Sequence, residues 1–320
     1  MRPREGASGE FSQSVQGRSP QDGRFAPSPS GTLHVGNLRT ALLAWLFARR
    51  AEARFLVRIE DLDPGRSRRE HEQRQLADIA ALGLDWDGPV ERQSERRELY
   101  RAALEQLRGE QRVYPCWCTR AEIREAASAA HGPLPEGAYP GTCRELTAAQ
   151  RAEREASGRT PAWRLDARAE RVAFEDRLHG RVEGVVDDLV LWRGDDTPAY
   201  NLAVVVDDGE QGIGEVVRGD DLLDSTPRQL LLQRLLGLPA PSYAHVPLVL
   251  APDGRRLAKR HGAVTLEDLH AERGWEPADA LGWMAVSLGL AEPGERVTPA
   301  LLESRFAPRR LPREPATFAG

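Results

Sequence analysis

The sequence has 320 residues, of which 40% are hydrophobic and 29% are charged, as in an ordinary soluble globular protein with one large or two modest domains. No apolar run approaches the roughly 20 residues of a membrane-spanning helix, and the N-terminus lacks a hydrophobic signal-peptide core. We therefore predict a cytoplasmic protein with no membrane partner. The net charge of −5 gives no overall basic field for nucleic acid. A polyanion would have to bind one arginine cluster, at 66–69, 255–260 or 309–313, although charge alone favours solvated side chains there.

The first part of the chain alternates strand and helix patterns. Residues 1–23 are rich in Gly, Ser, Gln and Arg and are expected to be a disordered extension. Asn37 is the expected N-cap of the first helix. The elements expected next are a turn-rich loop at 25–31, a helix at 37–50, a strand at 55–59, and helices at about 70–82 and 95–107. This is a βαβ beginning, which is typical of a parallel α/β domain.

The pattern weakens from about 113 to 199, and we interpret this segment as an insertion between two halves of a sheet. Beyond it the expected elements are buried strands at 202–206 and 216–217, a helix opened by Thr226 and Pro227 and closed by Gly237, a strand at 245–250, and helices to about 290. The Pro- and Arg-rich end of the chain is expected to be flexible.

Lys259 is the only lysine in a chain with 44 lysine and arginine residues. It lies in Arg256-Leu257-Ala258-Lys259-Arg260, just after a turn at Asp253-Gly254. Lysine carries a compact ammonium group, whereas arginine carries a broad planar fork. Phosphate binding at a crowded reaction centre is the usual reason to need the compact charge. One residue by itself does not exclude chance.

The segment His34-Val35-Gly36-Asn37 lies between a glycine-containing loop and the start of a helix. Glycine lets the backbone approach a ligand, and a helix N-terminus offers free N–H groups to phosphate. A histidine there could donate a hydrogen bond to phosphate oxygens as charge develops. The four residues alone fit a plain capped turn equally well, but together with Lys259 they become specific.

These two motifs resemble the paired HIGH and KMSKS signatures of class I aminoacyl-tRNA synthetases. Asn37 replaces the final histidine of the first signature. The second signature keeps only its second lysine, and Arg256 retains the charge at the first basic position. Further segments are similar to glutamyl-tRNA synthetase, at 24–31, 58–61, 200–208 and 217–221. This many matches in order make an accidental resemblance untenable.

The resemblance implies a pocket for L-glutamate, which carries two carboxylates and one ammonium group. Arg24 and Arg218 would supply bidentate forks for the carboxylates, Glu60 a counter-charge for the ammonium, and Tyr200 a directional hydroxyl. The remaining glutamate-binding positions are Phe25, Ala26, Pro27 and Ser28. The implied catalytic residues are His34, Asn37 and Lys259. ATP would bind at His34, Gly36 and Lys259, with Mg²⁺ accompanying its phosphates.

All three cysteines fall in one short stretch, at Cys116, Cys118 and Cys143. An odd, clustered set favours a metal or free thiols over disulfides. Zinc usually takes a fourth ligand, and from chemistry alone His131 is the candidate. A smaller relative of glutamyl-tRNA synthetase, the glutamyl-queuosine tRNA(Asp) synthetase family, has a Cys-x-Cys…Tyr-x-x-x-Cys zinc site. That resemblance implies Tyr139 as the fourth ligand of one structural zinc.

The length of the chain also favours the smaller family. A glutamyl-tRNA synthetase would continue into an anticodon-binding region of roughly 100–200 residues, whereas about 50 residues follow His270 here. The implied activity is ATP-dependent formation of glutamyl-adenylate and transfer of glutamate to queuosine at the wobble position of tRNA(Asp), whose anticodon loop would enter the catalytic domain of a monomer. The alternatives are a truncated or partner-dependent glutamyl-tRNA synthetase, which would charge the 3′ end of tRNA, and a non-catalytic paralogue that binds glutamate or adenylate.

The implied fold class is α/β, a Rossmann-type class I aminoacyl-tRNA synthetase catalytic domain with a zinc-bearing insertion and a short helical C-terminal part. The expected domains are a disordered extension at 1–23, the first half of the catalytic domain at 24–112, the zinc-bearing insertion at 113–199, the second half at 200–240, a lysine-motif loop with a helical stem-contact-like region at 241–303, and a flexible tail at 304–320.

Overall fold

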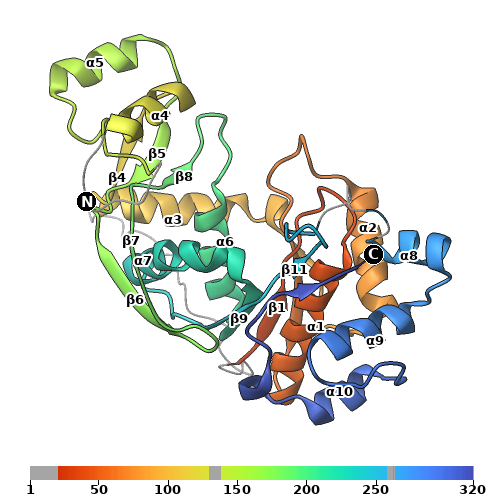
Figure 1. The fold of residues 1–320 in the computed structure, drawn as a ribbon. Coiled ribbons are helices and arrows are strands. Elements are labelled where there is room, and N and C mark those ends of the chain that lie inside the picture. Colours follow the sequence, from red (N-terminus) through yellow and green to blue (C-terminus); the bar gives the residue numbers. More distant parts are fainter. Residues whose placement is uncertain (1–20, 130–137, 258–261, 263, 320) are drawn as a thin grey trace, which may run out of the picture.

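A mostly parallel sheet forms the centre of the molecule (Figure 1). The structure is a computed structural model that describes residues 21–129, 138–257, 262 and 264–319. Within these residues the central sheet has seven strands, in the order β3-β2-β1-β9-β10-β6-β7. All neighbouring pairs are parallel except β6 and β7, which form an antiparallel hairpin at one edge. The strands are β1 (Gly23–Phe25), β2 (Phe55–Ile59), β3 (Glu91–Arg92), β6 (Arg171–Asp176), β7 (Gly180–Val185), β9 (Glu215–Gly219) and β10 (Ser242–Val246).

Helices cover both faces of this sheet. Successive strand residues point to opposite faces, so Val57 and Val217 pack in one core with α1 and α9, while Leu56 and Val216 belong to a separate cluster. Helices α3, α6 and α7 share a further core with parts of the region between the two sheet halves. The helices are α1 (Val35–Arg50), α2 (Arg69–Ala81), α3 (Arg97–Gly109), α6 (Tyr200–Gln211), α7 (Thr226–Leu236) and α9 (Pro277–Ser287). The predicted α/β architecture is confirmed.

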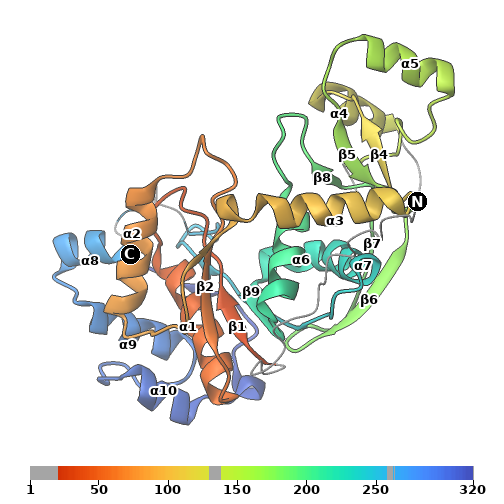
Figure 2. The ribbon, with the colours of Figure 1, turned by 180° about the vertical axis from the view of Figure 1, so that it is seen from behind.

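The predicted insertion divides into two parts. One part is a lobe with its own three-stranded sheet, which lies beyond the far end of α3 (Figure 2). This lobe contains β4 (Val113–Cys116), β5 (Ala162–Leu165), β8 (Val190–Trp192), α4 (Arg120–Ala129) and α5 (Ala148–Ala156). The other part is the β6–β7 hairpin, which joins the central sheet beside β10. Local sequence pattern could not reveal this division, because it depends on the pairing of β6 with the distant strand β10. At the contact of His245 with Asp176 the two strands are 69 residues apart in the sequence.

Several element boundaries differ from the sequence predictions. Residues 202–206 lie in helix α6 rather than in a strand. Helix α1 begins at Val35, and its N-cap is His34 rather than Asn37. The strand expected at 245–250 is two pieces, β10 and β11 (Val249–Leu250), because the chain turns away between them. Helix α7 begins at Thr226 and is closed by Gly237, as predicted, with Ser225 at the N-cap position but no capping hydrogen bond from its side chain. The remaining helix and strand predictions hold to within one or two residues.

The C-terminal part is helical, as predicted, but its last residues are not a loose tail. It contains α8 (Leu266–Arg273), α9, α10 (Pro299–Arg305), η4 (Pro308–Arg310) and β12 (Ala316–Thr317). β12 pairs in parallel with β11, and Phe318 is 1% exposed, with its ring edge-on to Trp283 at a centroid distance of 4.8 Å. Burial of this aromatic ring anchors the tail, so within the described residues 304–319 the prediction of flexibility was wrong.

Three further findings bear on the sequence predictions. Most of the expected N-terminal extension, residues 1–20, lies outside the described residues, whereas Asp22 is fully buried and Gly23 opens β1. Lys259 and His131 also lie outside the described residues. None of the helices that the structure describes is long and apolar enough to cross a membrane.

Candidate active site

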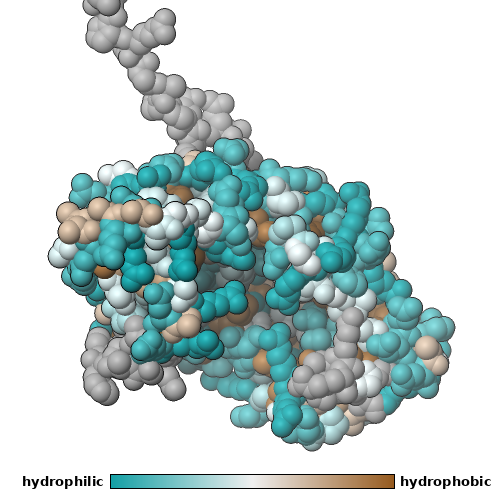
Figure 3. All heavy atoms as spheres, turned by 90° about the horizontal axis from the view of Figure 1, so that it is seen from above, coloured by the Kyte–Doolittle hydropathy of each residue, from teal (hydrophilic) through white to brown (hydrophobic). Residues whose placement is uncertain are grey.

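A cavity of about 630 Å³ opens at the carboxyl ends of the parallel strands β1, β2 and β9. This edge of a parallel sheet is where ligands bind in α/β folds. In the space-filling view from above, the surface has a hollow near the middle of the face, and hydrophobic residues are visible inside it (Figure 3). The predicted site residues that line the cavity are Arg24, Phe25, Ala26, Pro27, Ser28, His34, Gly36, Asn37, Glu60, Tyr200 and Arg218. The structure thus brings together all the predicted glutamate- and ATP-site residues that it describes.

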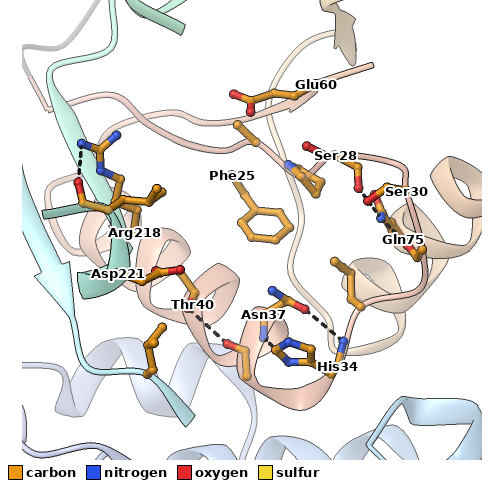
Figure 4. Close-up of a pocket in the computed structure, with 18 of the residues that line it drawn as sticks. Phe25, Ser28, Ser30, His34, Asn37, Thr40, Glu60, Gln75, Arg218 and Asp221 are labelled. Atoms are coloured by element: carbon orange, nitrogen blue, oxygen red, sulfur yellow. Dashed lines mark hydrogen bonds between the residues drawn. The ribbon is translucent and has the colours of Figure 1, made fainter. Parts of the chain in front are cut away.

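The first turn of α1 fixes the side chain of His34. The Asn37 backbone N–H donates to His34 Nδ1 at 3.2 Å, and the His34 backbone N–H donates to Asn37 Oδ1 at 3.2 Å (Figure 4). Burial and the nearby Arg256 guanidinium lower the pKa of His34 to about 4. The ring is therefore neutral near pH 7, with Nδ1 as acceptor and the proton on Nε2. Asn37 completes a capping box, and among the described residues its NH₂ group has no partner and is available to a ligand.

Gly36 lies where a side chain would collide with this turn. A Cβ atom there would be 3.0 Å from the His34 ring atoms Nδ1 and Cε1 and 3.2 Å from Val249 Cβ. Both distances are tighter than ordinary contacts, so a side chain here would have to displace the His34 ring or Val249 by a few tenths of an ångström. The Val35 N–H donates to the Val264 carbonyl at 2.8 Å, and the Asn37 N–H donates to His34. Among the described residues the Gly36 N–H is therefore the first-turn donor left for a ligand.

Gln75 holds the loop between β1 and α1. Its side-chain Nε2 donates to the carbonyls of Ser28 (3.0 Å) and Gly31 (2.6 Å), and the residue is 1% exposed. This glutamine comes from α2 and lines the cavity, where Figure 4 shows it beside Ser28 and Ser30. Sequence reasoning missed it, because a glutamine in a polar helix carries no local signal.

A buried charge network lies behind Arg24 and Glu60. Arg24 Nε donates to Asp208 Oδ1 at 3.2 Å, and Arg58 Nη1 lies 2.9 Å from the same oxygen. Burial opposes ionisation of Asp208, but the two guanidinium groups outweigh it and hold its pKa below the usual range. Asp207 binds Arg96 (2.7 Å) on the other side of the network. Asp208 thus occupies one edge of the Arg24 guanidinium. Part of the guanidinium that the sequence analysis expected to bind a substrate carboxylate is therefore already hydrogen-bonded within the protein.

Glu60 is the anionic member of the predicted glutamate pocket. Its Oε1 lies 3.5 Å from Arg58 Nη2, and its side chain is 11% exposed. Burial raises the pKa of Glu60 to about 6, despite the opposing charges of Arg58 and Arg24. A desolvated carboxylate that still faces a cavity is suited to pair with an ammonium group. Tyr200, at the start of α6, lines the same cavity and keeps 38% of its surface exposed.

Arg218 enters the cavity from β9, and buried acceptors hold its guanidinium. Nε donates to His245 Nε2 (3.0 Å), Nη1 to Gln229 Oε1 (2.8 Å), and Nη2 to Thr226 Oγ1 (2.8 Å). Nη2 also lies 3.5 Å from the Leu222 carbonyl. Among the described residues, these contacts leave one N–H of Nη1 for a ligand. A bidentate contact of the kind expected from the sequence would have to displace one of these partners.

The lysine motif reaches the cavity through Arg256. Its Nη1 forms an ion pair with Asp221, which lies in η2 (Asp220–Ser225), and both residues line the cavity. Arg256 therefore lies on the side of the cavity formed by the end of β9. The placement of Lys259 itself, three residues further on, stays a prediction.

The three cysteines and Tyr139 converge in the lobe beyond α3. The cysteine sulfurs lie within 4.8 Å of one another, with Cys118 and Cys143 separated by 3.4 Å. The Tyr139 hydroxyl lies 3.5 Å from Cys116 Sγ and 3.6 Å from Cys118 Sγ. The Cys143 backbone N–H donates to the same hydroxyl at 2.7 Å. A tetrahedral zinc with Zn–S bonds of about 2.3 Å keeps its sulfurs about 3.8 Å apart, so this cluster could hold a metal ion.

Comparison with known proteins shows the family to which this chain belongs. The family model for the catalytic domain of class I tRNA synthetases (E and Q) matches residues 22–296. The chain belongs to this synthetase family. A glutamyl-Q tRNA(Asp) synthetase of Nocardia farcinica is 62% identical over 295 residues, which cover 92% of this chain and 91% of the relative. A second, of Symbiobacterium thermophilum, is 52% identical over 92% of this chain and 94% of the relative.

Synthetases that carry a different name match over a smaller share of their length. The glutamate–tRNA ligase of Aquifex aeolicus is 40% identical, and the match covers 85% of this chain and 58% of the ligase. Among solved structures, a glutamate tRNA ligase from Elizabethkingia meningosepticum, in complex with its amino acid, superposes with a TM-score of 0.80 at 27% identity. That match covers 94% of this chain and 67% of the ligase chain. The resemblance to class I synthetases is confirmed, including the catalytic fold.

Proposed function

We propose that this protein activates L-glutamate with ATP and transfers the glutamyl group to queuosine at the wobble position of tRNA(Asp). The observation that carries glutamate activation is the convergence of Arg24, Glu60 and Arg218 on one cavity with the His34 turn. The cavity, at about 630 Å³, is of the size that takes ligands of this class. The choice of tRNA(Asp) rests on the synthetases named for that activity, which this chain matches over more than nine-tenths of their length.

In the first step, a carboxylate oxygen of glutamate attacks the α-phosphorus of ATP, and pyrophosphate leaves. Arg24 and Arg218 bind the substrate carboxylates, and Glu60 binds the ammonium group. The neutral His34 donates its Nε2–H to a phosphate oxygen, beside the Gly36 N–H at the start of α1. Lys259 supplies a mobile ammonium group to the phosphates. Mg²⁺ arrives with ATP and needs no dedicated set of protein ligands.

In the second step, a hydroxyl of the cyclopentene ring of queuosine attacks the carbonyl carbon of glutamyl-adenylate, and AMP leaves. No side chain has to act as a covalent nucleophile, because the adenylate is already an activated acyl group. The protein contributes by holding the two reactants in line and by stabilising the developing charge. Entry of an anticodon loop, function as a monomer and a cytoplasmic location are further parts of this proposal.

The cysteine cluster is proposed to hold one structural zinc. Cys116, Cys118, Cys143 and Tyr139 offer three thiolates and one phenolate, which suit this borderline-soft ion. The phenol oxygen already accepts a hydrogen bond from a backbone N–H, as a phenolate ligand would. A closed set of four ligands would tie β4 to the segment before α5. None of the four lines the cavity, so the ion has no part in the chemistry proposed there.

Transfer of labelled glutamate tests the proposal. The protein is incubated with ATP, labelled glutamate and bulk tRNA from cells that contain or lack queuosine. Label only on queuosine-containing tRNA supports the proposal. Equal label on both tRNAs, lost when the 3′ terminus is oxidised, indicates a short glutamyl-tRNA synthetase instead. Absence of label on either tRNA indicates a non-catalytic paralogue.

A further inference from the structure

His245 and Asp176 form a buried pair directly behind Arg218. His245 is 0% exposed and Asp176 4% exposed. His245 lies in β10 and Asp176 at the end of β6, so the pair joins two neighbouring strands of the central sheet. Neither residue lines the cavity, and neither was predicted from the sequence as part of a site. Their connection to the cavity runs through Arg218.

The hydrogen bonds around Asp176 determine which nitrogen of His245 carries the proton. Asp176 Oδ1 accepts from the backbone N–H groups of Leu178 (2.9 Å) and His179 (3.0 Å). Oδ2 accepts from the backbone N–H of His245 (3.1 Å) and lies 2.7 Å from its Nδ1. Because every neighbour of this carboxylate is a donor, the proton of a neutral His245 belongs on Nδ1.

This tautomer has a direct effect on Arg218. With the proton on Nδ1, Nε2 carries a lone pair, which accepts the Arg218 Nε–H at 3.0 Å. In the opposite tautomer Nε2–H could donate to Thr226 Oγ1, which lies 3.1 Å away, and Nε2 could no longer accept from Arg218. Thr226 and Gln229 fix the other two nitrogens, so the guanidinium plane is set at three points. The N–H of Nη1 that stays available is therefore held in one direction.

We propose that Asp176 and His245 are positioning residues for the substrate glutamate: they fix the tautomer that holds Arg218 in place to bind a substrate carboxylate. This inference rests on the proposed function, because it takes glutamate as the ligand of Arg218. The pair acts on the binding of glutamate and not on the phosphates. It should therefore affect the KM for glutamate far more than kcat or the KM for ATP.

Asp176→Asn is the sharpest test, because it keeps the shape and removes the constraint. Its amide oxygen can still accept from Leu178 and His179, but its NH₂ group then faces His245 Nδ1 and also the His245 backbone N–H, which loses its acceptor. Nδ1 becomes an acceptor, and the proton moves to Nε2, opposite Arg218. We expect the KM for glutamate in ATP–pyrophosphate exchange to rise on the order of 10- to 100-fold, with kcat and the KM for ATP within about threefold.

Two substitutions of His245 form a matched pair that stays informative if Asp176→Asn folds poorly. The amide oxygen of glutamine in His245→Gln reaches the position of Nε2 and can accept from Arg218, so the KM for glutamate should stay within about threefold of wild type. The shorter asparagine in His245→Asn reaches only the position of Nδ1, so it should raise this KM as Asp176→Asn does.

Nitrogen NMR of the ring supplies a readout that does not depend on activity. The free wild-type protein should show His245 protonated at Nδ1, and Asp176→Asn should show it protonated at Nε2. The wild-type tautomer together with the wild-type KM for glutamate in Asp176→Asn would overturn the inference. A fall in kcat accompanied by equal rises in the KM for glutamate and the KM for ATP would also overturn it, because such a uniform loss indicates a merely structural role. Absence of glutamate-dependent exchange in the wild-type protein would instead overturn the proposed function.

Discussion

Replacing Gly36 by alanine adds one methyl group at the point where α1 meets the candidate active site. The new Cβ would lie 3.0 Å from two ring atoms of His34 and 3.2 Å from Val249 Cβ. Val249 belongs to β11 and is 3% exposed, so it has little room to move. The His34 ring is the easier group to displace. Its displacement breaks the 3.2 Å hydrogen bond from the Asn37 backbone and redirects Nε2.

The expected effect on stability is small because two contributions oppose each other. Alanine is favoured over glycine in a helix by up to about 1 kcal/mol, less in the first turn. Loss of the N-cap hydrogen bond costs about 1 kcal/mol. The free energy of unfolding should therefore change by no more than about 1 kcal/mol. Loss of one preorganised donor to the developing phosphate charge should lower kcat for adenylate formation about 10²- to 10³-fold.

ATP–pyrophosphate exchange and thermal unfolding measure these two effects in the same preparation. Gly282→Ala is the matched control, because a Cβ there meets only the Glu295 carbonyl oxygen, at 3.8 Å, in the middle of α9. This variant should gain about 0.5–1 kcal/mol of stability and keep wild-type activity. Wild-type exchange by Gly36→Ala would refute the reasoning that the His34 ring needs this space.

The double variant His34→Ala/Gly36→Ala separates displacement of the ring from obstruction of the ligand. Without the ring, the methyl group added at position 36 loses its two nearest contacts, so the double variant should be no slower than His34→Ala alone. A further loss, close to the product of the two single effects, would mean that the methyl group itself blocks the phosphates.

Four further predictions concern the other charged and metal-binding groups. Glu60, with a pKa of about 6, takes up a proton as the pH falls, so kcat/KM for glutamate should drop below pH 6, approaching tenfold per pH unit; a profile from pH 5 to 8 that is flat in wild type would contradict its role as counter-charge. Cys143→Ser should lower bound zinc, measured by mass spectrometry after gel filtration, from about one per chain towards zero; unchanged zinc content would exclude the proposed ligand set. Lys259→Arg keeps the charge but should slow adenylate formation at least about tenfold, and an unchanged exchange rate would count against a need for the compact ammonium. Asp208→Asn leaves two buried arginines with one carboxylate fewer, so thermal unfolding should report a loss of about 3–5 kcal/mol; a loss below about 1 kcal/mol would show that the network tolerates a neutral partner.

Local pattern was sufficient where a helix or strand has one solvent-facing side or a clear end. Helices α2 and α3 expose polar faces, so their periodicity was readable, and β2 is a short apolar run between polar ends. The same reasoning failed for helix α6, part of which was predicted to be a strand. Its residues Leu202–Asp208 are all buried, so no polar side breaks the apolar run, and three consecutive valines are typical of a strand. Packing against α3 and α7 overrides that preference.

The sequence by itself identified many of the residues that line the cavity, because the glutamate and nucleotide motifs are short, contiguous segments at strand ends and at the start of a helix. Only the tertiary structure decided how those residues are held. Arg24 is held by Asp208, 184 residues away, and Arg218 by His245, which Asp176 orients from 69 residues upstream. When the partner of a residue lies in another strand or helix, the local sequence around that residue contains no pattern that reveals the partner. Buried charges need such partners, and only the folded sheet brings them within hydrogen-bonding distance.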